Sequence, residues 1–205
     1  LEFMIKAIKK SKLNPEKDVK ISLDVASSEF YKQNKYLLSA SNKSLNTEKM
    51  VDLLSGITEK YPIFSIEDGC AEDDWVGWKK LNYKLRDQVY IVGDDLFVTN
   101  KKRLEKGIKN DAANTILVKP NQIGTLTETL DTISLAKEHN IETIISHRSG
   151  ETEDNFISDL SVGTNSKMIK TGSVTRSERC SKYNRLLVIE RNNNNLIYSG
   201  NLLND

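Results

Sequence analysis

The sequence predicts an α/β fold in which short parallel strands alternate with helices. Six short runs rich in Ile and Val each end at a charged or ionisable residue, and these residues lie 23 to 43 positions apart (170 − 147 = 23; 67 − 24 = 43). One strand with its crossover helix needs about 30 residues, so the spacing fits consecutive βα units. The six terminal residues are Asp24, Glu67, Asp94, Lys119, His147 and Lys170.

The six runs are nearly continuous in apolar residues, which is typical of strands that are buried on both faces, as parallel strands are. In chain order they read KISLD, IFSIED, VYIVGDD, TILVK, ETIISH and MIK. In a barrel of parallel strands, the carboxyl ends form the active-site face. We therefore expect the six terminal side chains to meet at one edge of the sheet.

Helical spacing of apolar residues fills the segments between the strands, and residues suited to N-caps precede most of these segments. Six strands cannot close an eight-stranded barrel, so either the sheet is open or two strands precede Leu1. Besides an amphipathic helix before Pro15, we expect helices that begin near Thr47, Asp73 or Asp74, Asn100, Thr127, Thr152 and Ser177.

The composition limits the kinds of partner and the cellular location that we expect. The 205 residues include 30 Lys and Arg against 29 Asp and Glu, and this balanced charge gives no sign of a surface that attracts nucleic acid or a membrane. Cys70 and Cys180 are too few for a disulfide framework, and we expect a reducing, cytoplasmic location. The sequence has no apolar run long enough to span a bilayer and no signal-peptide pattern.

Three carboxylates at successive strand ends point to a metal. Asp24, Glu67 and Asp94 offer the hard oxygen ligands that Mg²⁺ takes together with waters and a substrate anion. The alternative is that each acid caps the following helix. The neighbouring Asp68 and Asp95 are predicted to be structural.

The lysines at strand ends suggest a base and an anion site. Lys119 follows an apolar run, where desolvation and a second ammonium group, such as that of Lys170, would lower its pKa and suit it to proton abstraction. Alternatively, Lys119 forms a structural ion pair with a carboxylate such as Asp94. Both interpretations remain open on this pattern.

The segment after the fifth strand, SHRSGETED, carries His147, Arg148 and Ser149. The guanidinium of Arg148 offers a bidentate fork for phosphate or carboxylate, and Ser149 adds a hydroxyl. The chain contains neither a P-loop nor a GxGxxG motif. The pattern as a whole indicates proton abstraction beside a metal-bound carboxylate, with a phosphate held by Arg148.

Eight motifs along the chain resemble those of one family. They are SLDVASSEFY, FSIEDG, AEDDWVGW, VGDDLFVTN, LVKPNQIGT, SHRSGETED, IKTGS and RSER. On these motifs the chain is similar to enolase (phosphopyruvate hydratase), of the bacterial type, from about Leu1 to Glu190, and KPNQIGT and SHRSGETED are specific to enolase within its superfamily.

The resemblance implies a role for each candidate residue. Lys119 corresponds to the base that removes the C2 proton of 2-phosphoglycerate, and Lys170 to the lysine that contacts the substrate carboxylate. Arg148 and Ser149 match substrate-phosphate and loop contacts, and His147 matches a histidine near the substrate. The three Mg²⁺ ligands correspond to Asp24, Glu67 and Asp94, and the product is phosphoenolpyruvate.

The resemblance also implies that residues 1–205 correspond to one part of a longer enzyme. We expect residues 1–205 to be part of a TIM-barrel catalytic domain, its last six βα units, without the first two strands. The N-terminal α+β domain of the family is expected to be absent; it carries the glutamate that acts as general acid and a lid with a metal-ligating serine. The chain alone is therefore expected to be inactive or weakly active.

Partners and alternatives follow from the same comparison. A full-length enzyme is expected to be a homodimer in the bacterial cytoplasm. The alternative function is a non-catalytic fragment of a split or degraded gene, serving at most as a metal-binding or protein-binding scaffold. Some bacterial enolases bind host proteins at the cell surface through C-terminal lysines; this chain ends in Asn204-Asp205, which weakens that possibility and that of a secreted pool.

Overall fold

The computed structural model describes residues 1–198 and 200 and divides into two compact units. Unit 1 comprises Leu1–Phe97 and Lys102–Thr115, and unit 2 comprises Val98–Lys101 and the chain from Ile116 onward. The C-terminal Asn204-Asp205 lies outside the described residues.

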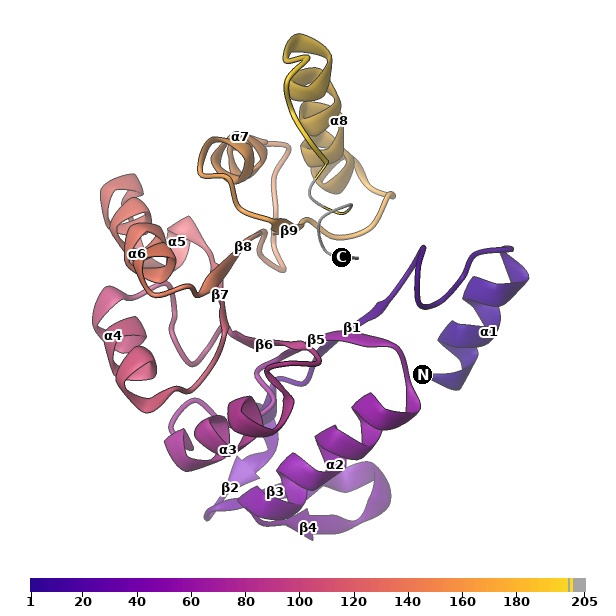
Figure 1. Cartoon of the computed structure of the whole chain (residues 1–205), viewed down its shortest axis with the longest axis vertical. Helices are drawn as coiled ribbons and strands as arrows, with labels where there is room; N and C mark the ends of the chain where they lie inside the picture. The colour runs from indigo at the N-terminus through magenta and orange to yellow at the C-terminus, as the bar shows by residue number, and fades with distance from the viewer. Residues whose placement is uncertain (199, 201–205) are drawn as a thin grey trace. The chain divides into compact units, whose positions relative to one another are not determined.

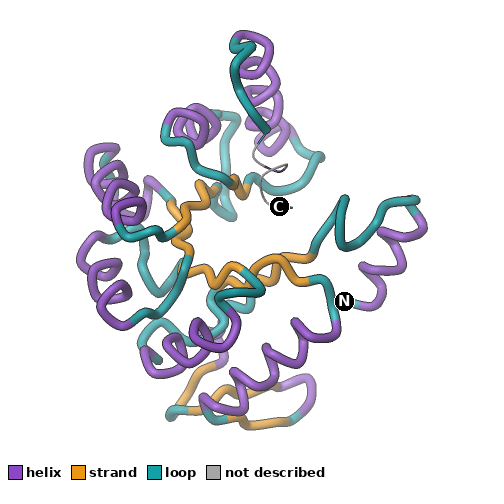
Figure 2. The backbone as a smooth tube through the Cα atoms, viewed as in Figure 1, coloured by secondary structure: helices purple, strands orange, loops and turns teal. Residues whose placement is uncertain are grey.

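The predicted alternation of strands and helices is present along the chain (Figure 2). The strand order β1-β5-β6-β7-β8-β9 follows the sequence, and the pairs β1/β5, β5/β6 and β8/β9 are parallel, which confirms the predicted α/β class with a six-stranded sheet. The strands are β1 (Ile21–Asp24), β5 (Ile63–Glu67), β6 (Tyr90–Gly93), β7 (Thr115–Val118), β8 (Glu142–Ser146) and β9 (Met168–Lys170).

Burial separates the middle strands of this sheet from its ends. Nearly every residue of β5, β6, β7 and β8 is buried, as the continuous apolar runs predict. The outer strands β1 and β9 are more exposed. Ile66 and Ile91 in unit 1, and Ile116 and Ile145 in unit 2, have no exposed surface and form the centre of the core within each unit.

Unit 1 also contains a small antiparallel sheet that the sequence did not reveal. Its strands are β2 (Tyr31–Lys32), β3 (Lys35–Leu38) and β4 (Lys43–Leu45), with 3₁₀ turns at Ser27–Phe30 and Ser39–Ser41. The two residues between β2 and β3, Gln33 and Asn34, both have positive φ, as a type I′ hairpin turn requires. The sheet packs beside helix α2 (Figure 1).

Helices α2, α3 and α4 of unit 1 begin at or next to the predicted start residues. The side chain of Asn46 accepts the amide N–H of Lys49 at the start of α2, and Asp74 accepts that of Gly77 at the start of α3. The helices are α1 (Glu2–Lys10), α2 (Thr47–Lys60), α3 (Trp75–Leu85) and α4 (Lys101–Asn110), whose first residue belongs to unit 2.

In unit 2, two helices begin at different residues from those predicted. Helix α6 begins at Leu126 because Thr125, not a later residue, accepts the amide of Glu128. Helix α7 begins at Phe156, because the side chains of Thr152 and Asp154 hold the preceding residues in a turn. The helices are α5 (Pro120–Ile123), α6 (Leu126–Glu138), α7 (Phe156–Gly163) and α8 (Ser177–Asn192).

Two further expectations concern the cysteines and the membrane. Both cysteines are free; Cys70 is fully buried, and Cys180 is half-buried on α8. Among the helices in the described part of the chain, none combines the length and apolar character that a bilayer crossing needs.

Candidate functional site

Unit 1 aligns the three predicted metal ligands at the ends of neighbouring strands. The Cα atoms of Asp24 on β1 and Glu67 on β5 are partners in the parallel register. Glu67 is in turn the partner of Val92 on β6, two residues before Asp94. Glu67 and Asp94 are 6% and 8% exposed, whereas Asp24 is exposed. The fold thus brings three acids to one edge of the sheet in this unit.

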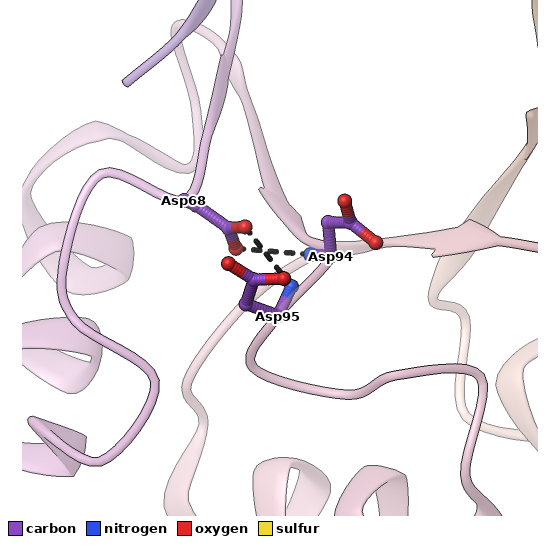
Figure 3. A group of neighbouring side chains, drawn as sticks. All are labelled: Asp68, Asp94 and Asp95. Carbon is purple, nitrogen blue, oxygen red and sulfur yellow. Dashed lines mark hydrogen bonds between the residues drawn. The ribbon is translucent and has the colours of Figure 1, made fainter. Parts of the chain in front are cut away.

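Asp68 holds the strand ends together in unit 1. One of its carboxylate oxygens accepts the amide of Asp94 at 3.0 Å and the other accepts that of Asp95 at 2.9 Å (Figure 3). Its own amide donates to the carbonyl of Val92, and its carbonyl accepts the amide of Ser27. These bonds agree with the predicted structural role of Asp68. They fix the backbone that carries Asp94.

The carboxylates also form a candidate cation site. Among the described residues, ligand atoms of Asp68, Asp94 and Asp95 lie within 4.8 Å of one another. Burial raises the pKa of Asp68 to about 7, and the two nearby carboxylates act in the same direction against the backbone hydrogen bonds that lower it. In Figure 3 the carboxylate of Asp94 points away from Asp68. We call Asp24, Glu67, Asp68, Asp94 and Asp95 the acidic cluster.

Unit 2 carries the predicted cationic residues at its own strand ends. Lys119 follows β7 directly, is half-buried, and precedes Pro120 at the start of α5. Its amide donates to the hydroxyl of Thr99 at 2.9 Å, and that hydroxyl donates to the Gln122 side chain at 2.7 Å. Thr99 is fully buried and has a positive φ of 55°. Thr99, which sequence reasoning missed, therefore fixes the backbone of Lys119.

His147 is held between β9 and α8. Its amide donates to the carbonyl of Lys170, the last residue of β9, at 2.9 Å. Its ring Nδ1 lies 2.7 Å from Nη1 of Arg179. Burial lowers the pKa of His147, and the positive charges of Arg179 and Lys170 lower it further, whereas a hydrogen bond with the backbone of Thr171 and the charge of Glu151 raise it. The net shift favours the neutral imidazole.

The two residues after His147 are exposed, and their backbone is anchored. Nη1 of Arg179 donates to the carbonyl of Arg148 at 2.9 Å, and Nη2 donates to that of Ser149 at 2.8 Å. The amide of Arg148 donates to Glu151 at 2.8 Å, and its guanidinium to Asn121 at 3.2 Å. We call Lys119, His147, Arg148, Lys170 and Arg179 the basic group.

Arg179 was not among the predicted site residues, although it lies in the RSER motif. No pattern in the sequence marks it, because its contacts depend on how α8 lies against the segment after β8. The acidic cluster suits a hard cation, and the basic group suits an anion such as phosphate or carboxylate. The structure therefore places the predicted acids Asp24, Glu67 and Asp94 at or just after strand ends of unit 1. The predicted residues Lys119, His147, Arg148, Ser149 and Lys170 lie at or shortly after strand ends of unit 2.

Comparison with known proteins identifies the family. Residues 1–204 match the family model described as "Enolase, C-terminal TIM barrel domain". Over 191 residues the chain is 53% identical to the enolase of a Nitratiruptor species; the match covers 93% of this chain and 45% of that relative. The chain thus spans less than half the length of the curated relative. These matches confirm the resemblance to enolase that the sequence motifs predicted, and the chain belongs to the enolase family.

Proposed function

We propose that the chain provides the metal-binding and substrate-binding strand ends of a glycolytic enolase, which interconverts 2-phosphoglycerate and phosphoenolpyruvate with loss or gain of water. The observation that carries the proposal is the register of unit 1, which aligns Asp24 with Glu67 and leads to Asp94 on the next strand. Three acids at adjacent strand ends suit a divalent cation, and we propose Mg²⁺.

The proposed roles divide between the two units. A Lys or His base working with one or two Mg²⁺ ions is the general arrangement of the enolase superfamily. Bound Mg²⁺ would stabilise the negative charge that develops on the substrate carboxylate when the C2 proton leaves. Asp24, Glu67 and Asp94 would hold the metal, and Lys119 would take the C2 proton.

The remaining residues of the basic group would bind the substrate. Lys170 would contact the carboxylate, and Arg148 and Ser149 the phosphate, for which an exposed guanidinium and hydroxyl are suited. The neutral His147 would lie beside the substrate as a hydrogen-bond donor. The proton that accompanies the departing hydroxide would come from an acid outside these residues. Homodimerisation and a cytoplasmic location remain predictions from the family.

The test is a chimera in which this chain replaces the 45% of the Nitratiruptor enolase that it matches. We expect Mg²⁺-dependent formation of phosphoenolpyruvate, and we expect Lys119→Ala to lower kcat by at least about 10²-fold, the usual contribution of a general base. Lys79→Ala, an exposed lysine on α3, is the matched control and should leave kcat unchanged. The 205-residue chain assayed alone should show little or no turnover.

Two outcomes would contradict the proposal. Turnover by the chimera that survives Lys119→Ala would exclude this lysine as the base. A folded chimera that binds Mg²⁺ but never turns over would favour the scaffold function instead. Calorimetric Mg²⁺ titration of the chain with Asp94→Asn, against the exposed Asp131→Asn as control, separates loss of the metal site from general damage.

A further inference from the structure

The guanidinium of Arg179 makes three contacts with the three consecutive residues that follow β8. It reaches Nδ1 of His147 at 2.7 Å, the carbonyl of Arg148 at 2.9 Å and that of Ser149 at 2.8 Å. Arg148 and Ser149 are exposed, so little packing holds this segment in place. The fixed geometry of the five guanidinium N–H groups suits several acceptors at once.

The contact with Nδ1 determines the tautomer of His147. An arginine can only donate, so Nδ1 must accept and carries no proton, and the proton of the neutral ring resides on Nε2. A protonated Nδ1 would face the guanidinium as donor against donor. The other charged groups near the ring are Lys170 on β9, which acts with Arg179, and Glu151 in the following loop, which opposes them. The ring also has a hydrogen bond with the backbone of Thr171, which raises its pKa and would engage the remaining N–H when no ligand is bound.

The space for this contact depends on Gly172. Its φ is +88°, and a Cβ built there would lie 2.8 Å from Cδ of Arg179 and 3.1 Å from Cε1 of His147. Any larger residue would therefore push the guanidinium away from the imidazole. This close approach is independent of the hydrogen bonds and shows that the backbone after β9 is shaped around the pair.

A second cation of α8 anchors the far end of the same segment. The ammonium of Lys182, which is fully buried, lies 2.8 Å from the Glu151 carboxylate and donates to the carbonyl of Thr152 at 2.6 Å. Glu151 in turn accepts the amide of Arg148. Helix α8 thus holds residues 147–152 at both ends, and the contact of Arg179 reaches the side chain of His147, a predicted substrate-binding residue.

We infer that Arg179 is a positioning residue, which keeps His147 as the Nε2–H tautomer and fixes the backbone of Arg148 and Ser149 so that these groups are prearranged for a phosphate. The inference rests on the proposed function in taking phosphate as the ligand. A donor at Nε2 suits an anion, whereas an unprotonated Nε2 would repel one. A residue that only stabilised the helix would leave the tautomer of His147 unchanged.

The first test reads the tautomer directly, by ¹⁵N NMR of histidine-labelled chain. The chain has two histidines, and His139, exposed at the end of α6, serves as the internal reference. In Arg179→Met we expect Nδ1 and Nε2 of His147 to move towards an averaged tautomer, and its titration midpoint to rise, because one neighbouring positive charge is lost. His139 should not change. Arg185→Met, which breaks a half-buried ion pair between α8 and Asp159 on α7, is the control.

The second test uses inorganic phosphate as the probe. We expect Arg179→Met to weaken binding by about tenfold, which corresponds to one charge-assisted hydrogen bond. Arg179→Lys retains the charge but cannot reach three acceptors. Its binding of phosphate should therefore improve on that of Arg179→Met by less than about threefold, which is half of the loss on a logarithmic scale. Full recovery by Lys would overturn positioning in favour of a simple charge effect.

An unchanged tautomer and midpoint of His147 in Arg179→Met would overturn the inference outright. Should that variant fail to fold, Gly172→Ala retains Arg179 but displaces it, and the same change in His147 is expected. None of these measurements requires turnover. If the chimeric enzyme is inactive while the tautomer of His147 still depends on Arg179, the proposed function fails and the positioning role stands.

Discussion

The acidic cluster of unit 1 and the basic group of unit 2 are organised by opposite chemistry. In unit 1, the carboxylate of Asp68 accepts two backbone amides beside Asp94. In unit 2, the guanidinium of Arg179 donates to two backbone carbonyls beside His147. The organising side chain of unit 1 is an acid beside the acids Asp94 and Asp95, and that of unit 2 is a cation beside Arg148. By the sign of its charges, the acidic cluster is suited to a cation and the basic group to an anion.

Removing the buried cation of unit 2 should cause the largest loss of stability among the variants that test this comparison. Lys182→Met would leave the mostly buried Glu151 carboxylate and two backbone carbonyls without their partner. Breaking a buried ion pair typically costs about 3–5 kcal/mol, so we expect a loss of free energy of unfolding in that range. Urea denaturation followed by circular dichroism measures it.

The matched control is Arg185→Met on the same helix, which removes a much more exposed pair with Asp159 than that of Lys182 and should have a smaller effect. If Lys182→Met and Arg185→Met cost the same, the buried pair of Lys182 has no special role in holding the segment.

In unit 1, the corresponding variant is Asp68→Ala, which removes the carboxylate that organises the acidic cluster. The amides of Asp94 and Asp95 would lose their acceptors, which should cost about 2–3 kcal/mol of stability. Because Asp68 fixes the backbone of Asp94 and also offers a carboxylate to the acidic cluster, we also expect Mg²⁺ affinity to fall by about 10–100-fold. Isothermal titration calorimetry measures this fall. Unchanged affinity in a folded Asp68→Ala chain would show that the backbone of Asp94 needs no such support.

Thr99→Val is a milder test, within unit 2. It removes the acceptor of the Lys119 amide and the donor to Gln122 while preserving the shape of a fully buried side chain. We expect a loss of about 1–2 kcal/mol in thermal or urea unfolding. In the chimera, kcat should fall with little change in KM if Thr99 orients the base. The exposed Thr127→Val should change neither quantity.

The smallest expected effect is a pH dependence specific to unit 2. The pKa of His147 is lowered from its ordinary 6.5 in the folded state, so the folded chain binds fewer protons than the unfolded chain just below that pH. The contribution of His147 to stability is therefore complete above pH 6.5 and is lost as pH falls towards the lowered pKa. The difference in unfolding free energy between the chain and His147→Gln should shrink over that interval. If this difference in unfolding free energy did not change with pH, the lowered pKa of His147 could not be its cause.

The strands were predictable because their signal is local. Runs such as TILVK combine β-branched residues with a polar end, and the structure places β7 within that run. The start of α7 was predicted four residues early (156 − 152 = 4), because Thr152 is a suitable cap that instead closes a turn. The sheet β2–β4 was missed because it lies inside a long interval that the βα pattern assigns to a connection.

The candidate site was predictable only in part, because only some of its features are local in the sequence. The residue that ends each strand can be read from the sequence, and parallel register then aligns Asp24 with Glu67. The contacts of Asp68 and Arg179 depend on tertiary geometry that no local pattern encodes. The assignment of ligands, base and substrate contacts therefore remains a prediction from the family and the strand ends.

The contrast between the two cysteines gives the chain a built-in chemical reporter. Burial raises the pKa of Cys70 to about 12, so almost none of its thiol is ionised at neutral pH. Cys180, half-buried on α8 directly after Arg179, is the thiol that a reagent reaches in the folded chain. Alkylation at Cys70 would then time the transient opening of unit 1, while a probe on Cys180 would follow the helix that carries Arg179.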